Sequence, residues 1–213
     1  MDESQSREET TRQPDSVRPG RHHGFDDSYK GTPPWDIGRP QPSFLELARS
    51  GALRGRVLDV GCGTGEHALM AAGLGLDATG IDTASTAIAR AQDKARERGL
   101  TVGFLVSDAL DLSALGRHFD TVLDCGLFHV FDDADRRSFV ESLTGAVAPG
   151  GRYFLLCFSE HEPGDWGPRR VTQAEIRASF FSGWRVDSIE PAKLEVTMNP
   201  EGVAGWRACL TRI

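Results

Sequence analysis

Apolar residues along the chain gather into short, nearly continuous runs, separated by stretches with helical spacing. Five runs lack the alternation of a half-exposed strand and are typical of parallel strands buried on both faces. These runs are residues 56–60, 77–82, 102–108, 119–125 and 152–158. Helical stretches fit between them at 66–72, 84–98 and 132–147. Strands that alternate with helices predict a parallel sheet with right-handed crossovers and helices on both faces.

The last third of the chain breaks this alternation. Residues 184–191 and 205–213 follow one another with no clear helix between them, so we expect them to pair as an antiparallel edge. Together with the five parallel runs they predict a single α/β domain, built around a doubly wound, mostly parallel seven-stranded sheet. The sequence contains no internal repeat that would indicate a second domain.

Two short signatures mark the starts of further helices. Ser43 and Glu46 have the spacing of a capping box, and Gly51 provides a stop signal, which predicts a short helix ending there. Thr172 and Glu175 repeat the capping-box spacing. They predict another helix, which follows a long loop rich in glycine and proline.

Composition narrows the function classes. Residues 1–24 contain almost nothing apolar beyond Val17, so they are predicted to form a disordered acidic and polar tail, while residues 25–213 form the domain. Acidic residues outnumber basic ones 31 to 24, giving a net charge of -7 that would repel a nucleic acid backbone. No apolar run approaches the roughly 20 residues of a membrane span, and the N-terminus lacks a secretion signal. We therefore expect neither a nucleic acid nor a membrane partner.

Cysteine and histidine usage indicates a reducing compartment and no metal. Cys62, Cys125, Cys157 and Cys209 are widely spaced without a C-x-x-C motif, which predicts free thiols in a cytoplasmic protein. The six histidines show no H-x-x-x-H spacing and no cysteine cluster accompanies them, so no metal site is expected. The sequence carries no signal of oligomeric state.

The strongest chemical signal is "VLDVGCGTGEHAL", residues 57–69, at the end of the first predicted strand. Its glycines allow a sharp turn and let a ligand approach backbone amides. The spacing G-x-G-x-G differs from the dinucleotide pattern G-x-G-x-x-G. Asp59 and Glu66 flank the loop, and two carboxylates would repel a pyrophosphate but attract a ligand with an ammonium and a sulfonium. That description fits S-adenosylmethionine.

The sequence resembles the class I S-adenosylmethionine-dependent methyltransferases over nearly all of residues 31–213. The resemblance rests on the glycine loop, "TGID" ending the second strand, "SDALDL" after the third, "FDTVLDCGLFHV" at the fourth and "VAPGGRYFLL" before the fifth. It implies a Rossmann-like fold in which Asp82 holds the cofactor ribose, Asp108 and Ala109 border the adenine, and the Cys125 carbonyl lies near the methionine end. The predicted cofactor-binding residues are Trp35, Asp59, Gly61, Gly63, Gly65, Asp82, Thr83, Asp108, Ala109 and Cys125.

Structural roles are open alternatives for several of these residues. Asp82 could cap the helix that follows it, and Glu66 could complement its own helix dipole. Asp108 could be a turn residue, and Cys125 could be present only because a small side chain fits. Asp59 lies inside an apolar strand, where an acid needs a partner, so it should have a functional or loop-organising role.

The segment "PPWDIGRPQPSFLEL" resembles the T-P-W-D-x-G region of the thiol, thiopurine and halide methyltransferases, although its proline density is higher. In that branch the segment folds over the cofactor, which implies that residues 25–50 form a lid. Trp35 would provide an aromatic wall near the sulfonium, and Tyr29 would extend the lid. Alternatively, Trp35 fills a hydrophobic gap.

Two further segments are predicted to complete a substrate pocket. Phe128 and His129 follow the fourth strand, where His129 could act as a base or could be a hydrogen-bonded core residue. The loop after the fifth strand offers Trp166 as a wall and Arg169 or Arg170 for an anionic substituent, or it is simply a solvated loop. The predicted substrate-binding residues are Tyr29, Phe128, Trp166, Arg169 and Arg170.

Methyl transfer from a sulfonium mainly requires alignment of the nucleophile and exclusion of water. A thiol needs little help from a base, so the absence of an obvious catalytic dyad favours transfer to a small organic thiol. An O- or N-methyltransferase of an aromatic or heterocyclic metabolite is the nearest alternative. A nicotinamide-dependent oxidoreductase is disfavoured by the glycine spacing, and a regulatory, non-methylating protein on the same fold is the alternative of another class.

Overall fold

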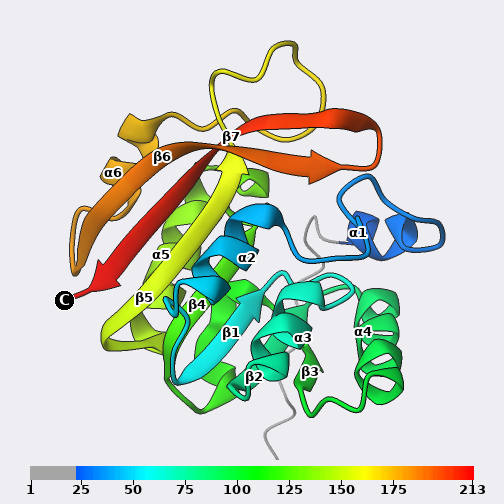
Figure 1. Ribbon diagram of the computed structural model, residues 1–213. Helices are drawn as coiled ribbons and strands as arrows, with labels where there is room; N and C mark the ends of the chain where they lie inside the picture. Colours follow the sequence, from blue (N-terminus) through cyan, green and yellow to red (C-terminus); the bar gives the residue numbers. More distant parts are fainter. Residues whose placement is uncertain (1–22) are drawn as a thin grey trace, which may run out of the picture.

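A computed structural model describes residues 23–213, which form a seven-stranded sheet with helices on both faces (Figure 1). The strands are β1 Arg56–Val60, β2 Asp77–Asp82, β3 Gly103–Val106, β4 Phe119–Cys125, β5 Val147–Phe158, β6 Trp184–Val196 and β7 Asn199–Arg212. The α-helices are α1 His23–Ser28, α2 Pro42–Arg49, α3 Glu66–Gly73, α4 Ser85–Glu97, α5 Asp133–Ala146 and α6 Gln173–Ser179. Two 3₁₀ segments are η1 Ala109–Leu115 and η2 Phe128–Val130.

The sheet has the order β3-β2-β1-β4-β5-β7-β6. Strands β1 to β5 pair in parallel, whereas β7 runs antiparallel to both β5 and β6. The predicted fold class, a doubly wound and mostly parallel sheet with an antiparallel edge, is therefore confirmed. From β1 the chain adds strands toward one edge of the sheet, and from β4 it adds strands toward the opposite edge. The strand order therefore reverses between β1 and β4. Ligands bind open parallel sheets at such a reversal, beyond the carboxyl ends of the strands.

Successive residues of the central strands pack into two separate core layers. On one face Val57, Leu123 and Phe154 pack with side chains of α2 and α3. On the other face Leu58 and Tyr153 join the apolar side chains of α5 and α6. Because both faces are covered, the strands are apolar at nearly every position, which is why the sequence pattern identified them.

The hairpin of β6 and β7 is longer than the sequence pattern predicted. The last residue of β5, Phe158, pairs with Gly205, and the hairpin continues past that point through Leu194 opposite Val203 to Val196 opposite Asn199. In Figure 1 this far end of the hairpin reaches over the sheet toward α1. The extension places the turn of the hairpin beyond the carboxyl end of β5, where the parallel strands end.

The predicted capping box of Ser43 and Glu46 is wrong. Helix α2 begins one residue earlier, with Pro42 in its first turn and Gln41 as N-cap, and no side-chain hydrogen bond caps it. Proline favours the first helical position, and the Gln41 side chain instead bonds the backbone of Glu195. The second predicted box is confirmed, since Thr172 and Glu175 make both reciprocal hydrogen bonds at the start of α6.

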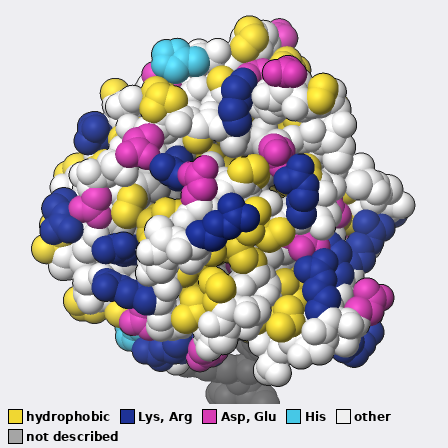
Figure 2. All heavy atoms as spheres, viewed as in Figure 1, with side chains coloured by type: hydrophobic (Ala, Val, Ile, Leu, Met, Phe, Trp, Pro, Cys, Tyr) yellow, Lys and Arg dark blue, Asp and Glu magenta, His cyan; other side chains and the backbone are white. Residues whose placement is uncertain are grey.

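The predicted tail, residues 1–24, lies outside the described residues except for its last two positions, which belong to α1. Its disorder stays a prediction, and so does the domain boundary. Figure 2 shows basic and acidic side chains interspersed over the visible face, with apolar atoms between them. Among residues 23–213, no helix has the length and apolar character that a membrane crossing requires.

Gly65 is a packing residue of this fold. Its φ is 85°, and a Cβ there would lie 2.6 Å from Phe104 Cζ and 2.8 Å from the Ala91 methyl group. Gly75 has a similar φ of 80°, but a Cβ there would meet nothing within 4 Å. Comparing alanine substitutions at Gly65 and Gly75 therefore separates the cost of backbone strain from the cost of steric overlap.

We expect Gly75→Ala to lower the free energy of unfolding by about 1–2 kcal/mol through its left-handed backbone alone. Gly65→Ala should cost about 1–3 kcal/mol more, because its methyl group must also displace Phe104 or Ala91. Urea denaturation of both variants measures the difference. Equal losses of stability would contradict the packing role of Gly65.

Candidate active site

A pocket of about 950 Å³ opens at the carboxyl ends of the parallel strands. Its walls come from the lid, the glycine loop, the ends of β2, β4 and β5, the loop after β5 and the turn of the β6–β7 hairpin. Eleven predicted site residues line it: Tyr29, Trp35, Gly61, Gly63, Asp82, Thr83, Ala109, Cys125, His129, Trp166 and Arg169. Five do not: Asp59, Gly65, Asp108, Phe128 and Arg170.

Asp82 joins the end of β2 to the glycine loop. One carboxylate oxygen accepts the Gly63 N–H at 2.9 Å, and the other accepts the Ala84 N–H at 2.8 Å. Burial raises the pKa of Asp82, and these N–H donors partly offset that effect. Gly61 and Gly63 adopt φ values of 67° and 52°, which bring their backbone to the pocket wall. The carboxylate thus organises the loop and also lines the pocket.

Asp59 supports this loop from below. Its side chain is buried at the end of β1, where one oxygen accepts the Ala68 N–H of α3 at 3.1 Å. The other oxygen accepts no hydrogen bond from any described residue and lies 3.8 Å from Nδ1 of His67. Asp59 does not line the pocket, so the structure gives it the loop-organising role and not the predicted direct contact.

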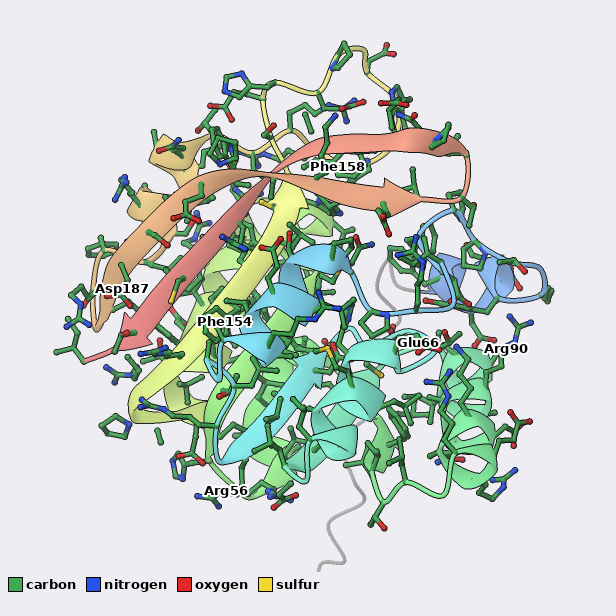
Figure 3. All side chains as sticks on the ribbon, viewed as in Figure 1. Arg56, Glu66, Arg90, Phe154, Phe158 and Asp187 are labelled. Carbon is green, nitrogen blue, oxygen red and sulfur yellow. The ribbon has the colours of Figure 1, made fainter. Side chains whose placement is uncertain are left out.

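Glu66 differs from its expected electrostatic role. Its carboxylate accepts hydrogen bonds from Lys94 at 2.8 Å and from Arg98 at 2.8 and 2.9 Å, both from the end of α4 (Figure 3). These two cations compensate the charge that was expected to attract a sulfonium, and that part of the charge argument is wrong. Asp108 also has a structural role, because its side chain caps η1 through the Leu110 N–H at 2.9 Å.

The predicted lid segment contacts the glycine loop. The indole N–H of Trp35 donates to Tyr29 Oη at 2.9 Å, and a Cβ on Gly63 would lie 2.7 Å from that same oxygen. Asp36 accepts a hydrogen bond from the Thr64 hydroxyl at 2.9 Å. The lid therefore contacts the loop through both an aromatic pair and a hydrogen bond.

Helix α4 holds one end of the lid. Asp26 of α1 accepts the Thr86 N–H at 2.8 Å in the first turn of α4, a helix whose own N-cap, Ala84, provides no side-chain hydrogen bond. Arg90 of α4 donates to the carbonyls of Tyr29 and Gly31, and Figure 3 shows it where α4 approaches α1. Asp26, at the start of the lid, thus caps helix α4 although it lies outside that helix.

The β6–β7 hairpin holds the other end. The side-chain amide of Gln41 donates to the Glu195 carbonyl and accepts the Glu195 N–H, both at 2.9 Å. Arg39 forms an ion pair with the Glu195 carboxylate, and the Thr197 N–H donates to the Pro34 carbonyl at 2.9 Å. As a result Leu194, Glu195 and Met198 join the pocket wall, a contribution that the sequence analysis missed.

Phe128 is a core residue, which corrects its predicted contact with substrate. It is fully buried and stacks on Phe180 with ring centroids 5.9 Å apart. The cause is Asp124, whose carboxylate accepts the N–H groups of Leu127 and Phe128 and the Tyr153 hydroxyl. This turn directs Phe128 inward and leaves Leu127 on the pocket wall. Burial raises the pKa of Asp124 to about 7.

His129 lines the pocket but is tied to the backbone. Its Nδ1 accepts the Phe158 N–H at 3.0 Å, and its ring meets the Phe158 ring edge-on at 4.9 Å. A neutral ring whose Nδ1 accepts must carry its proton on Nε2, the atom that faces away. Burial, together with the nearby charges of Arg170 and Arg136, lowers the pKa of His129 to about 3. The predicted base is therefore a neutral hydrogen-bond donor at neutral pH.

Arg170 shapes the loop after β5 instead of lining the pocket. Its guanidinium donates to the backbone carbonyls of Glu162, Pro163, Gly164, Trp166 and Pro168. It also lies over the Phe158 and Trp166 rings, at 5.3 and 5.5 Å from their centroids. Arg169 does line the pocket, where Asp133 and Glu175 pair with it. Among residues 23–213 no group of three His, Cys, Asp or Glu side chains could hold a metal ion.

Comparison with known proteins gives the family. Residues 57–151 match the family described as "Methyltransferase domain". The 2-heptyl-1-hydroxyquinolin-4(1H)-one methyltransferase of Mycobacteroides abscessus is 40% identical over 181 residues, 80% of this chain and 80% of that protein. The probable thiol methyltransferase 2 of Arabidopsis thaliana is 29% identical over 178 residues, 81% of this chain and 78% of that protein.

Among solved structures, one reported for the conversion of a disulfide bond into a thioacetal group during echinomycin biosynthesis is similar along most of the chain. It is 36% identical with a TM-score of 0.82, and covers 90% of this chain and 93% of that one. These likenesses extend well beyond the glycine loop, to the lid and the β6–β7 hairpin. The chain therefore belongs to the S-adenosylmethionine-dependent small-molecule methyltransferases.

Proposed function

We propose that this methyltransferase acts on an acidic heteroatom, a thiol in the first instance, of a small apolar acceptor. The observation that carries the proposal is a spacious, largely apolar pocket wall in which, among residues 23–213, the lining carboxylates and His129 are each already bonded to the protein. Apolar side chains from the lid, from β5 and the loop after it, and from the hairpin line the pocket; they include Ile37, Phe158, Trp166, Leu194 and Met198. Such a wall suits an uncharged acceptor body.

The residues at the glycine-loop end fit the cofactor. Each oxygen of Asp82 accepts one N–H, and a carboxylate oxygen has capacity for a second donor, so both could also accept ribose hydroxyls. Ala109 would border the adenine, and Gly61, Gly63 and the Cys125 carbonyl would approach the methionine end. Trp35 would cover it from the lid. When bound, S-adenosylmethionine supplies an electrophilic methyl group with an activated leaving group.

The carboxylates of the pocket wall are all engaged in the structure. Asp36 accepts from Thr64, Glu66 pairs with Lys94 and Arg98, and Glu195 pairs with Arg39. Asp132 accepts two N–H groups as the N-cap of α5, and Asp82 is bonded as described above. Because Nδ1 of His129 accepts the Phe158 N–H, its Nε2 carries the ring proton and offers no lone pair. The acceptor must therefore lose its proton without a protein base, as a thiol or an acidic hydroxyl can.

The chain's own contribution is then alignment and dehydration of the reacting atoms. The lid and the hairpin turn close the pocket from above, and the neutral His129 Nε2–H can donate a hydrogen bond to an anionic acceptor atom. A thiolate is the more nucleophilic of the candidate anions, which favours sulfur. The 40% identical relative is named for a hydroxyquinolone, and this observation makes O-methylation of an acidic ring hydroxyl the second candidate.

The proton question is tested with thiols and phenols of different pKa. We expect kcat/KM to rise with pH up to the acceptor's own pKa and to level off above it, because only the deprotonated acceptor reacts. His129→Asn preserves an acceptor for the Phe158 N–H and should lose less than about tenfold, far from the 10²–10⁴ that general base catalysis supplies. If kcat/KM instead rises with the same pH midpoint for all acceptors, and this midpoint is lost in His129→Asn, then His129 is the base.

The cofactor position is tested at Asp82. Asp82→Ala should weaken binding of S-adenosylhomocysteine by at least about 10- to 150-fold, the effect of losing a single hydrogen bond to a charged group, because both carboxylate oxygens and the support of the glycine loop are lost. Asp77→Ala, at the opposite end of β2, removes only an ion pair with Arg117 and should leave the affinity unchanged. Calorimetric titration measures both. Equal affinity in the two variants would place the cofactor elsewhere.

The lid is tested at its attachment to α4. Asp26→Ala removes the cap at Thr86 and should weaken S-adenosylhomocysteine binding several-fold, because the lid must dock to cover the glycine loop. The matched control is Asp27→Ala on the same helix, which loses only an exposed ion pair with Lys30. The same titration applies. If the two variants bind alike, docking of the lid does not contribute to cofactor affinity.

A further inference from the structure

We propose that the mouth of the pocket is a subsite for an apolar chain carried by the acceptor, formed by Trp35, Val130, Trp166 and Met198. The inference rests on the proposed function, because it names the part of the acceptor that lies outside the reacting end. It assigns specificity to side chains at the solvent-exposed opening of the pocket. The acceptor class it predicts is a ring with an acidic heteroatom and a hydrocarbon tail.

The four side chains are apolar, line the pocket and yet remain open to solvent. Their exposed fractions are 45% for Trp35, 36% for Val130, 39% for Trp166 and 63% for Met198. They come from four separate segments: the lid, η2, the loop after β5 and the turn of the β6–β7 hairpin. Exposed apolar side chains that gather around one opening indicate a binding surface, whereas single ones scattered over a surface do not.

The two tryptophans of this rim are held in place by specific contacts. Trp35 donates its indole N–H to Tyr29 and meets the Phe25 ring edge-on at 6.1 Å. Trp166 meets Phe158 edge-on at 5.5 Å and lies under the Arg170 guanidinium. A protein that fixes exposed indoles in this way lowers the entropy lost when a ligand covers them.

The charges at the rim favour an uncharged occupant. Two arginines line the pocket, and both are paired: Arg39 with Glu195, and Arg169 with Asp133 and Glu175. A charged tail would have to compete with these carboxylates, whereas a hydrocarbon chain gains by covering the four apolar side chains. The pocket volume of about 950 Å³ is at the upper end of the range for small-ligand sites. Since rim and pocket are continuous, the occupant that reaches both is the acceptor itself.

The test is a series of 4-alkylthiophenols in which only the alkyl chain lengthens, so that the thiol pKa stays nearly constant. We expect kcat/KM to rise about fourfold for each methylene group that the rim covers, with KM falling and kcat nearly unchanged. The increase should stop once the chain passes beyond Met198. A second readout needs no turnover: binding of the corresponding S-methyl products to the protein loaded with S-adenosylhomocysteine should show the same dependence.

Substitutions at Met198 test where the alkyl chain of the acceptor binds. Met198→Asp should flatten the dependence on chain length for both readouts, while Met198→Leu should retain it. The matched control is Phe181→Asp, which alters an apolar side chain that is 85% exposed and does not line the pocket. It should keep the full dependence. Both positions are exposed, so all three variants are expected to fold.

Two outcomes would overturn the subsite. One is methylation that does not depend on chain length, which would leave the proposed function intact. The other is a dependence on length that Met198→Asp does not change, which would place the chain elsewhere. Binding of the protein to phosphatidylcholine vesicles, lost in Met198→Asp and without any chain-length effect, would assign the rim to a lipid surface. If no acceptor is methylated the proposed function fails, while product binding still decides on the subsite.

Discussion

Gln41 joins the three parts of the protein that enclose the pocket. Its side-chain amide bonds both backbone groups of Glu195 in the hairpin, and its own N–H donates to Nε2 of His67 in α3 at 3.2 Å. Its position as N-cap also sets where α2 begins. The residue is buried, so these bonds act in a low dielectric where an unpaired amide is costly. Gln41 therefore joins the lid, the hairpin and helix α3, which follows the glycine loop.

The same need for pairing determines the chemistry of the pocket. The carboxylates near it serve the structure: Asp82 holds the glycine loop, Asp124 turns the chain after β4, and Glu66 joins α3 to α4. His129 supports the end of β5 through the Phe158 N–H. Each of these groups already satisfies a buried donor or a cation, so its first role is structural. An enzyme built in this way suits a methyl transfer that needs alignment and dry surroundings more than proton transfer.

Sequence patterns predicted the parts that depend on local order. The buried strands appear as apolar runs, the glycine loop has a recognisable spacing, and Thr172 with Glu175 closes a capping box by itself. Local patterns were misleading where a partner far along the chain determines the role of a residue. Ser43 and Glu46 have the right spacing, but Gln41 is held by a hairpin 154 residues away. Glu66 pairs with Lys94 and Arg98 at the end of α4, which lie 28 and 32 residues further along the chain.

The most instructive failure is the choice between Leu127 and Phe128. Both are apolar and adjacent, and the sequence offers no period that says which one faces the pocket. The decision is made by Asp124, which accepts both of their N–H groups and the Tyr153 hydroxyl. A buried acid in "FDTVLDC" was a visible anomaly, because an acid inside an apolar strand needs a partner. The same reasoning that assigned Asp59 to the glycine loop, applied to Asp124, would have predicted a tight turn after β4.

The reach of the hairpin was hidden for a different reason. The far half of β6 carries Pro191 and charged residues, so its apolar run ends early in the sequence although the strand continues to Val196. This half of β6 still pairs with β7, but β7 has lost its other neighbour there, because β5 ends at Phe158 opposite Gly205. A strand pair that leaves the sheet exposes both faces, and its residues become polar except where they meet something else. Its apolar residues divide between two such contacts. Val203 and Leu194 are buried against the core beside α2, while Leu194 and Met198 line the pocket. The apolar residues that persist in the projecting hairpin therefore mark where it meets the core and the pocket.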